Sequence, residues 1–331
     1  MPVKEPLVIL TGPTAVGKTK LSIDLARKVG GEIISADSMQ VYRRMDIGSA
    51  KIRPEEMGGV PHYLIDVLEP TEEFHVVKFQ QLAKEAVQKI RENGHIPIVV
   101  GGTGFYIQAL LYDIDFTENE AETGIRAELE KLAGEEGGGE RLHQLLAKVD
   151  PKAAEEIHAH NVKRVIRALE FYRLTGKRIS EHNAQQREKE SPYRFAYFVL
   201  DDERARLYER IDGRVDQMLQ EGLLEEVKGL KAEGLGRGMV SMQGLGYKEM
   251  LSYLDGVYSF EEAVRILKRD TRHFAKRQLT WFRRERDVIW VEKQDFQYDD
   301  AKILDYMLEK LREKGIVPQP DAGGAERKNH K

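Results

Sequence analysis

The chain has 331 residues, of which 41% are hydrophobic and 33% are charged, and its formal net charge is −4. This length is sufficient for about two domains with buried cores. With 29 glycines and 11 prolines, the composition excludes a collagen-like or low-complexity chain. The absence of cysteine excludes a disulfide framework, a thiolate nucleophile, an iron–sulfur cluster and any cysteine-ligated zinc site. It also fits a reducing compartment.

The first 116 residues alternate between strand patterns and helix patterns. Such alternation predicts an α/β fold with a doubly wound parallel sheet. Ligands bind these sheets at the carboxyl ends of the strands, where the 12–19 loop, Asp37 and Thr103 are expected. The predicted strands are Leu7–Thr11, Ile33–Ala36, Tyr63–Leu68 and Ile96–Val100, and the predicted helices are Lys18–Val29 and Val76–Asn93.

The pattern changes after about residue 116. Residues 118–192 contain helical stretches and no strand pattern, whereas Arg194–Leu200 again resembles a core strand. We therefore predict a catalytic core made of residues 1–116 and 193–316, interrupted by a helical insertion domain at 117–192. Within the second core segment, residues 203–286 are predicted to be helical, Val288–Val291 a strand and Asp299–Lys314 a helix. The polar tail, residues 317–331, is predicted to be disordered.

No segment has the pattern of a targeting or membrane-spanning sequence. The apolar stretch Leu7–Leu10 is too short for the core of a signal peptide. The longest uncharged run, Ile96–Tyr112, carries three glycines and is shorter than a spanning helix. We expect a cytoplasmic protein without membrane contact.

Residues 12–19 form a phosphate-binding motif between a strand and a helix. Glycines at both ends let successive backbone N–H groups turn toward phosphate oxygens, and the helix N-terminus adds positive potential. Lys18 supplies a mobile charge, and Thr19 offers its hydroxyl to Mg²⁺. The motif reads Gly12-Pro13-Thr14-Ala15-Val16-Gly17-Lys18-Thr19.

The loop predicts a bound di- or triphosphate but does not identify the reaction. ATP-dependent enzymes of this type usually hold magnesium with an Asp at the end of a second strand, and the Ile96–Val100 strand ends in Gly101. Asp66 is a possible substitute and equally fits a turn. The phosphates could instead belong to a diphosphate leaving group. Two alternatives are therefore a small-molecule kinase that uses Asp37 as its base, and a nucleotide-gated RNA-binding module without transfer chemistry.

Positive charge is concentrated in two segments. Residues 163–194 carry nine Lys/Arg and four acids, and residues 265–286 carry nine Lys/Arg and two acids. In the second segment, Arg265, Arg269, Arg272 and Lys276 share one face of a predicted helix. These segments could bind a polyanion, and charge alone equally fits solvated helix faces.

A series of motifs in chain order gives the sequence a specific resemblance. From about residue 7 to 290 it resembles the tRNA dimethylallyltransferase family. After the phosphate loop, the matching motifs are Asp37-Ser38-x-Gln40-x-Tyr42, Met45-Asp46-Ile47-Gly48, Gly101-Gly102-Thr103-Gly104-Phe105-Tyr106, Arg164-x-x-Arg167-Ala168-Leu169-Glu170, Arg210-x3-Arg214-x3-Met218, Gln243-Gly244-Leu245-Gly246-Tyr247-Lys248-Glu249 and Ala275-Lys276-Arg277-Gln278-x-Thr280-Trp281.

The resemblance implies a fold, a reaction and a set of site residues. It implies a P-loop NTPase-like core and transfer of a dimethylallyl group from dimethylallyl diphosphate to the N6 amine of the adenosine 3′ of a tRNA anticodon. The diphosphate would lie in the phosphate loop with Mg²⁺, near Lys18 and Arg214. Asp37 would be the general base, and Thr103 would lie near the target base. The residues implied to face the anticodon stem-loop are Asp37, Ser38, Met39, Gln40, Thr103, Lys163, Arg164, Val165, Ile166, Arg167, Gln243, Gly244, Leu245, Gly246, Tyr247 and Lys248.

The chain departs from the family pattern at three places. Gly48-Ser49-Ala50-Lys51-Ile52 stands where Gly-Thr-Ala-Lys-Pro is frequent, and Pro61-His62-Tyr63 stands where Pro-His-His is frequent. Neither departure removes a residue with an assigned role. Eukaryotic relatives carry a C-terminal zinc finger, which this cysteine-free chain lacks, so the resemblance is to the bacterial form. Separately, we expect a monomer.

Overall fold

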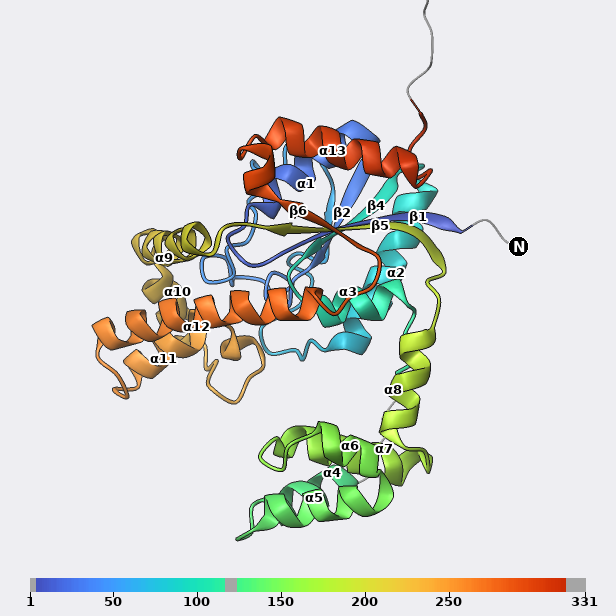
Figure 1. Cartoon of the computed structure of the whole chain (residues 1–331). Coiled ribbons are helices and arrows are strands. Elements are labelled where there is room, and N and C mark those ends of the chain that lie inside the picture. Colours follow the sequence, from blue (N-terminus) through green and yellow to red (C-terminus); the bar gives the residue numbers. More distant parts are fainter. Residues whose placement is uncertain (1–3, 117–123, 320–331) are drawn as a thin grey trace, which may run out of the picture. The chain divides into compact units, whose positions relative to one another are not determined.

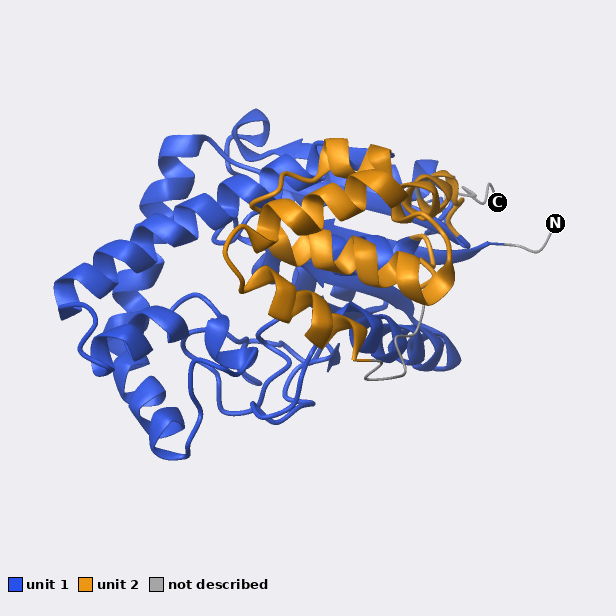
Figure 2. Cartoon of the chain, turned by 90° about the horizontal axis from the view of Figure 1, so that it is seen from below, with its two compact units in different colours: residues 1–111, 192–331 blue, residues 112–191 orange. Residues whose placement is uncertain are grey.

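A computed structural model of the protein describes residues 4–116 and 124–319 (Figure 1). The chain divides into two compact units, one made of residues 1–111 and 192–331 and the other of residues 112–191 (Figure 2). Most of the predicted tail, residues 320–331, lies outside the described residues.

Unit 1 is built on a six-stranded, all-parallel sheet with the order β3-β2-β4-β1-β5-β6. This sheet confirms the predicted α/β fold with P-loop NTPase-like architecture. Because β1 lies between β4 and β5, both halves of the sheet meet at the end of β1, where the phosphate loop begins. The strands are β1 (Glu5–Thr11), β2 (Gly31–Ala36), β3 (His62–Tyr63), β4 (Ile96–Gly101), β5 (Tyr193–Asp201) and β6 (Val288–Glu292).

The strand predicted at Tyr63–Leu68 is mostly wrong. Only His62 and Tyr63 pair with β2. Leu64 and Asp66 have φ angles of 64° and 54°, which turn the backbone out of the extended conformation. Leu68 then makes one isolated bridge to Tyr42. The apolar pattern here belongs to a turn that buries Leu64 and Leu68 and leaves Asp66 and Val67 exposed.

Helices cover both faces of the sheet, as a doubly wound arrangement requires (Figure 1). One face carries α1 (Lys18–Val29) and α13 (Asp300–Glu313), and the other carries α2 (Val76–Glu92) and α3 (Gly104–Leu111). The remaining helices of unit 1 are α9 (Arg204–Glu221), α10 (Leu223–Ala232), α11 (Tyr247–Leu254) and α12 (Phe260–Phe282), with short 3₁₀ turns η1 (Ser241–Gln243) and η2 (Lys293–Phe296). No helix of the described residues has the length and apolarity needed to cross a bilayer.

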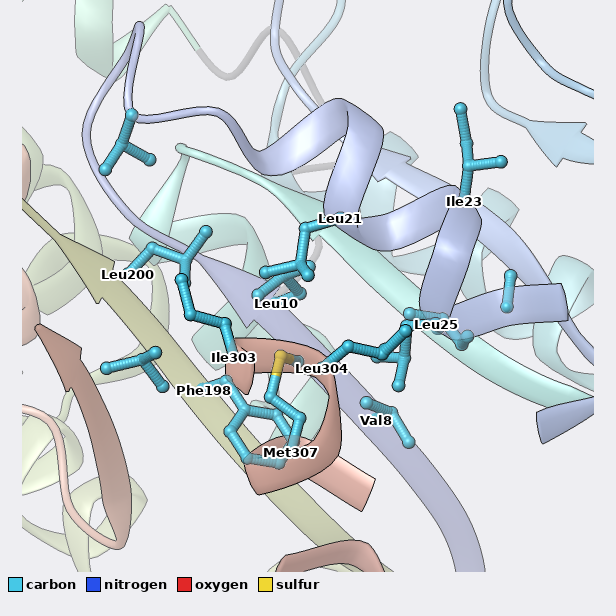
Figure 3. Close-up of a cluster of buried hydrophobic side chains, with 14 of the residues drawn as sticks. Val8, Leu10, Leu21, Ile23, Leu25, Phe198, Leu200, Ile303, Leu304 and Met307 are labelled. Atoms are coloured by element: carbon cyan, nitrogen blue, oxygen red, sulfur yellow. The ribbon is translucent and has the colours of Figure 1, made fainter. Parts of the chain in front are cut away.

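The main core lies between the sheet and the α1/α13 layer (Figure 3). Alternate residues of the strands point into this layer because side chains alternate across a strand. Ile23 of α1 and Leu304 of α13 are 7% and 9% exposed, and the other labelled side chains are 2% exposed or less: Val8 and Leu10 from β1, Phe198 and Leu200 from β5, Leu21 and Leu25 from α1, and Ile303 and Met307 from α13. This packing fixes α1, and with it the phosphate loop, on the central strand.

Unit 2 is a small helical bundle with its own core. It comprises α4 (Ile125–Ala133), α5 (Gly138–Val149), α6 (Pro151–Glu156), α7 (Val162–Thr175) and α8 (Ile179–Glu188). Leu129, Leu142, Leu146 and Val165 are fully buried in it. The buried Glu170 carboxylate binds Arg126 at 2.9 Å. Asp150 caps α6 and accepts hydrogen bonds from the N–H and hydroxyl of Ser180, at 2.9 and 2.6 Å.

Leu25→Ala should destabilise unit 1 by about 2–5 kcal/mol, because it removes a fully buried side chain and leaves a cavity. Urea unfolding followed by tryptophan fluorescence tests this expectation. Both tryptophans, Trp281 and Trp290, belong to unit 1 and report its unfolding. Val67→Ala, at a position 41% exposed, serves as the control. Equal shifts for the two variants would contradict the assignment of Leu25 to the core.

Candidate active site

The phosphate loop begins at the end of β1, beside the end of β5. A Cβ on Gly12 would lie 2.4 Å from the carbonyl oxygen of Leu200, and Gly12 has a φ of 145°. Only glycine is tolerated here, because a larger residue would collide with the β5 backbone. Gly17, with a φ of 102°, then ends the loop at the N-terminus of α1. The structure therefore forms the strand–loop–helix element that the motif predicts.

Lys18 is the central cation of this loop. Its Nζ donates to the carbonyl oxygens of Gly12 and Pro13, at 3.0 and 2.8 Å. No described carboxylate forms an ion pair with it. Burial, and to a smaller extent the nearby Arg214, lower the pKa of Lys18 from 10.5 to about 7, and Asp37 partly opposes this shift. A buried ammonium group with this surrounding is an electrostatic match for a phosphate oxygen.

Three side chains from the second half of the chain hold the tip of the loop. Each contacts the backbone of one of three consecutive residues, so the tip is supported along its length. Gln278 Oε1 accepts from the Thr14 N–H at 2.9 Å, Arg210 Nε donates to the Ala15 carbonyl at 2.8 Å, and Lys293 Nζ donates to the Val16 carbonyl at 3.4 Å.

Asp37 and Thr103 lie side by side at the ends of β2 and β4. Ala36 pairs with Gly101 in the sheet, and the Thr103 N–H donates to the Ala36 carbonyl at 3.3 Å. The Asp37 Oδ1 accepts from the N–H groups of Met39 and Gln40, at 2.8 and 3.2 Å. Its Oδ2 accepts no hydrogen bond from the described residues. One oxygen of Asp37 thus caps a turn, and the other remains available to accept a proton. Asp37 can therefore act both as a cap and as a general base.

Arg214 reaches the same region from α9. Burial lowers its pKa, Asp37 opposes that shift, and the neighbouring Arg210 adds to it. Asp37 acts on the pKa values of both Lys18 and Arg214. The site therefore combines two partly buried cations with one carboxylate, at the edge of the sheet where parallel strands end.

Comparisons with known proteins identify the family of this chain. The sequence profile of the IPP transferase family matches residues 40–285. The chain is 64% identical over 313 residues to a tRNA dimethylallyltransferase of Lachnoclostridium phytofermentans, covering 95% of this chain and 99% of the relative. It is 51% identical over 311 residues to one from Bacillus licheniformis, covering 93% and 98%. The chain belongs to the tRNA dimethylallyltransferase family.

Solved structures of the family have the same fold. A full-length tRNA isopentenylpyrophosphate transferase of Bacillus halodurans is 48% identical, with a TM-score of 0.71, and the match covers 95% of this chain and 99% of that one. A eukaryotic dimethylallyltransferase acting on tRNA is 30% identical, with a TM-score of 0.82 and coverage of 96% and 81%.

Within this dimethylallyltransferase fold, two segments predicted to face tRNA meet in unit 1. The Met39 side chain packs against the backbone of Gly244, and the Tyr247 ring packs against Gly48. Residues 38–40 and 243–248 therefore form one surface next to Asp37. Tyr247 itself is fully buried, so it supports this surface from below, whereas Gln243 is exposed and Lys248 partly exposed.

A partly buried carboxylate that sequence analysis did not identify supports this surface. Glu226 accepts from three consecutive N–H groups and from the Tyr247 hydroxyl, at 2.7 Å. The three N–H donors are those of Asp46, Ile47 and Gly48, at 2.9, 2.8 and 3.1 Å. The spacing of a Glu within an amphipathic helix gives no signal for such a role.

The predicted tRNA-facing residues 163–167 lie on α7 of unit 2. Val165 and Ile166 are 0% and 4% exposed and belong to the core of that unit. Their side chains are therefore structural, whereas Lys163, Arg164 and Arg167 are exposed on the same helix. Partial desolvation of its guanidinium and the neighbouring Arg126 lower the pKa of Arg167.

The predicted basic face of α12 is largely neutralised. Arg265 pairs with Glu262 at 2.6 Å, Arg269 with Asp270 at 2.8 Å and Arg272 with Asp212 at 2.5 Å. Among the described residues, Lys276 has no such partner. It lines a hollow of about 370 Å³ with His273, Arg277, Thr280, Trp281 and Arg284. The cations available to a polyanion are therefore concentrated at the C-terminal end of α12.

The protein supplies few metal ligands of its own. The described residues contain no group of three or more His, Asp or Glu side chains that could hold a metal ion. Asp66, considered as a magnesium ligand, binds Lys51 Nζ at 2.6 Å and so has a structural role. Thr19 is exposed in the first turn of α1, where its hydroxyl oxygen could bind a metal ion beside the phosphate loop.

Lys18→Met should stabilise the fold more at about pH 7 than at about pH 9.5. At pH values between about 7, the pKa of Lys18 in the folded chain, and 10.5, its ordinary pKa, Lys18 binds a proton in the unfolded chain but not in the folded chain. Stability of the native protein therefore rises with pH across this window, and methionine removes the dependence. Urea midpoints at the two pH values measure this difference, with Lys302→Met on the exposed side of α13 as control. A gain in stability that is the same at both pH values would contradict the lowered pKa of the buried Lys18.

Proposed function

We propose that this protein transfers a dimethylallyl group from dimethylallyl diphosphate to the N6 amine of the adenosine 3′ of a tRNA anticodon, releasing diphosphate. The observation that carries the proposal is the meeting of a phosphate loop with the Asp37–Thr103 pair at one sheet edge. One part offers positive charge to a leaving diphosphate, and the other offers a carboxylate to an attacking amine. Membership of the tRNA dimethylallyltransferase family supports both assignments.

On the donor side, cleavage of the carbon–oxygen bond places negative charge on diphosphate. The groups available to stabilise that charge are the loop N–H groups, the Lys18 ammonium and the Arg214 guanidinium. Preorganised donors in a partly buried site lower the barrier because they need no rearrangement as charge develops. Binding of the anion should also favour the protonated form of Lys18, which its surroundings otherwise disfavour.

On the acceptor side, an adenine amine is a weak nucleophile because its lone pair is delocalised into the ring. As its nitrogen bonds to the allyl carbon, the amine must lose a proton. The Asp37 Oδ2, which accepts no hydrogen bond from the described residues, would take that proton, an effect worth about 10²–10⁴ in rate. Thr103, next to Asp37, would orient the base. A base in a loop is easier to extrude than one in a duplex.

The residues present fit a magnesium ion held mainly by substrate. Mg²⁺ prefers oxygen ligands and keeps several waters, so one protein hydroxyl and the diphosphate oxygens suffice. Thr19 would supply that hydroxyl. When bound, the ion would supply further neutralisation of the diphosphate charge.

The surface formed by residues 38–40 and 243–248 would receive the anticodon loop, with Lys276, Arg277 and Arg284 as further phosphate contacts. Lys163, Arg164 and Arg167 of unit 2 would contact the anticodon stem-loop. We further propose that the protein acts as a monomer in the cytoplasm, where its tRNA substrate is found.

The decisive test is incubation with unmodified tRNA, labelled dimethylallyl diphosphate and Mg²⁺, without ATP. Label in the RNA supports transfer. ATP-dependent phosphorylation of a small molecule would instead indicate a kinase. Tight RNA binding with neither reaction would indicate a binding module.

Asp37→Asn should slow single-turnover transfer by about 10² or more, because asparagine cannot take the amine proton. The amide oxygen can still accept from Met39 and Gln40, so the fold and tRNA affinity should persist. Asp305→Asn, on the exposed side of α13, is the matched control. Transfer at a rate near that of the unmodified protein would reject Asp37 as the base.

A further inference from the structure

Gln278 is a buried polar residue on an otherwise apolar helix face. It is 6% exposed and shares this face of α12 with Leu267, Ala275 and Phe282. A buried primary amide is costly unless its donor and acceptor are both satisfied. Its partners therefore show what the position requires.

Both partners belong to the two loops of the proposed active site. The Gln278 Oε1 accepts from the Thr14 N–H of the phosphate loop at 2.9 Å. Its Nε2 donates to the Gly102 carbonyl, immediately before Thr103, at 3.0 Å. These loops are 264 and 176 residues away in sequence. One amide thus spans the space between the donor-binding loop and the acceptor-side turn.

The adjoining backbone is shaped to receive this amide. A Cβ on Gly102 would lie 2.1 Å from the Gln278 Nε2, so no larger residue could stand there while the contact persists. The two backbone partners present opposite requirements, an acceptor for Thr14 and a donor for Gly102. A neutral amide of this length meets both requirements, whereas methionine meets neither and an ionised glutamate meets only the first.

We propose that Gln278 is a positioning residue that sets the distance between the two substrate sites. It contacts no reacting atom. By joining the loop that holds diphosphate to the turn that carries Thr103, it fixes the allyl carbon relative to the attacking amine. This inference rests on the proposed transfer reaction. A displacement of about 1 Å between reactants can cost about 10² in rate.

The first test compares Gln278→Met with the unmodified protein. Single-turnover transfer should fall about 10- to 100-fold, while the dissociation constants for tRNA and for diphosphate change less than about threefold. Gln88→Met is the control, because Gln88 lies exposed on α2 with its amide bound to Glu92. A rate within about twofold of the unmodified protein, or a loss confined to substrate affinity, would overturn the proposal.

Gln278→Glu supplies a signature that a purely structural role would not give. A protonated carboxyl can accept from Thr14 and donate to Gly102, whereas the carboxylate repels the Gly102 carbonyl. The transfer rate of this variant, divided by that of the unmodified protein at each pH, should therefore rise as pH falls from about 8 to about 6. A ratio that stays constant with pH would contradict the bridging role.

Hydrogen exchange separates this proposal from the proposed reaction. In Gln278→Met, peptides covering residues 12–19 and 102–107 should both exchange faster, because the variant releases both loops. This result does not depend on which reaction the protein performs. If the unmodified protein transfers no label, the proposed function fails while the exchange result still decides whether Gln278 joins the loops. Faster exchange in only one peptide, or in neither, would overturn the inference.

Discussion

The phosphate loop depends on a buried ammonium group that forms no ion pair with a described carboxylate. The Lys18 Nζ donates to two carbonyl oxygens of its own loop, and burial together with the nearby Arg214 lowers its pKa to about 7. The positive charge of such a site is not balanced until an anion binds. A carboxylate in the position of the phosphate would neutralise the charge and remove the binding site. The fold therefore tolerates an unfavourable cation, and the proposed function explains it as the binding group for the substrate diphosphate.

The loop that holds this cation is supported by contacts from distant parts of the chain. β1 and α1 form the loop, but Arg210, Gln278 and Lys293 hold its tip, and all three follow the 112–191 unit in sequence. The second core segment must fold onto the first before the loop has its full support. The parallel sheet makes this possible, because β5 pairs along the whole of β1 and delivers α9 to the loop. The insertion can therefore interrupt the sequence without separating the groups that support the loop.

The sequence predicted what depends on local pattern and missed what depends on distant contacts. The glycine spacing of residues 12–19 and the alternation of strands and helices identified the loop and the sheet, because both follow from backbone requirements. The strand predicted at Tyr63–Leu68 was mostly wrong, since apolar burial does not distinguish a strand from a buried turn with positive φ angles. The α12 basic face was predicted from helical spacing, which gives no information on Asp212, the partner of Arg272 from another helix. Glu226 was missed for the same reason, and Gln278 was named in a family motif but given no role. A further signal for Gln278 was the position of a glutamine on the apolar face of an amphipathic helix.

Asp37 illustrates how one side chain can serve both the fold and the proposed chemistry. Its Oδ1 is held by two backbone N–H groups, so the carboxylate plane cannot rotate freely. That restraint directs Oδ2 without any additional residue, and no described group competes for it. A carboxylate on a longer side chain would lose the short-range cap, because the local geometry of an Asx-type turn requires the aspartate length. A neutral cap of the same size would keep the turn and lose the proton acceptor. The turn and the proposed proton transfer therefore both favour aspartate at this position.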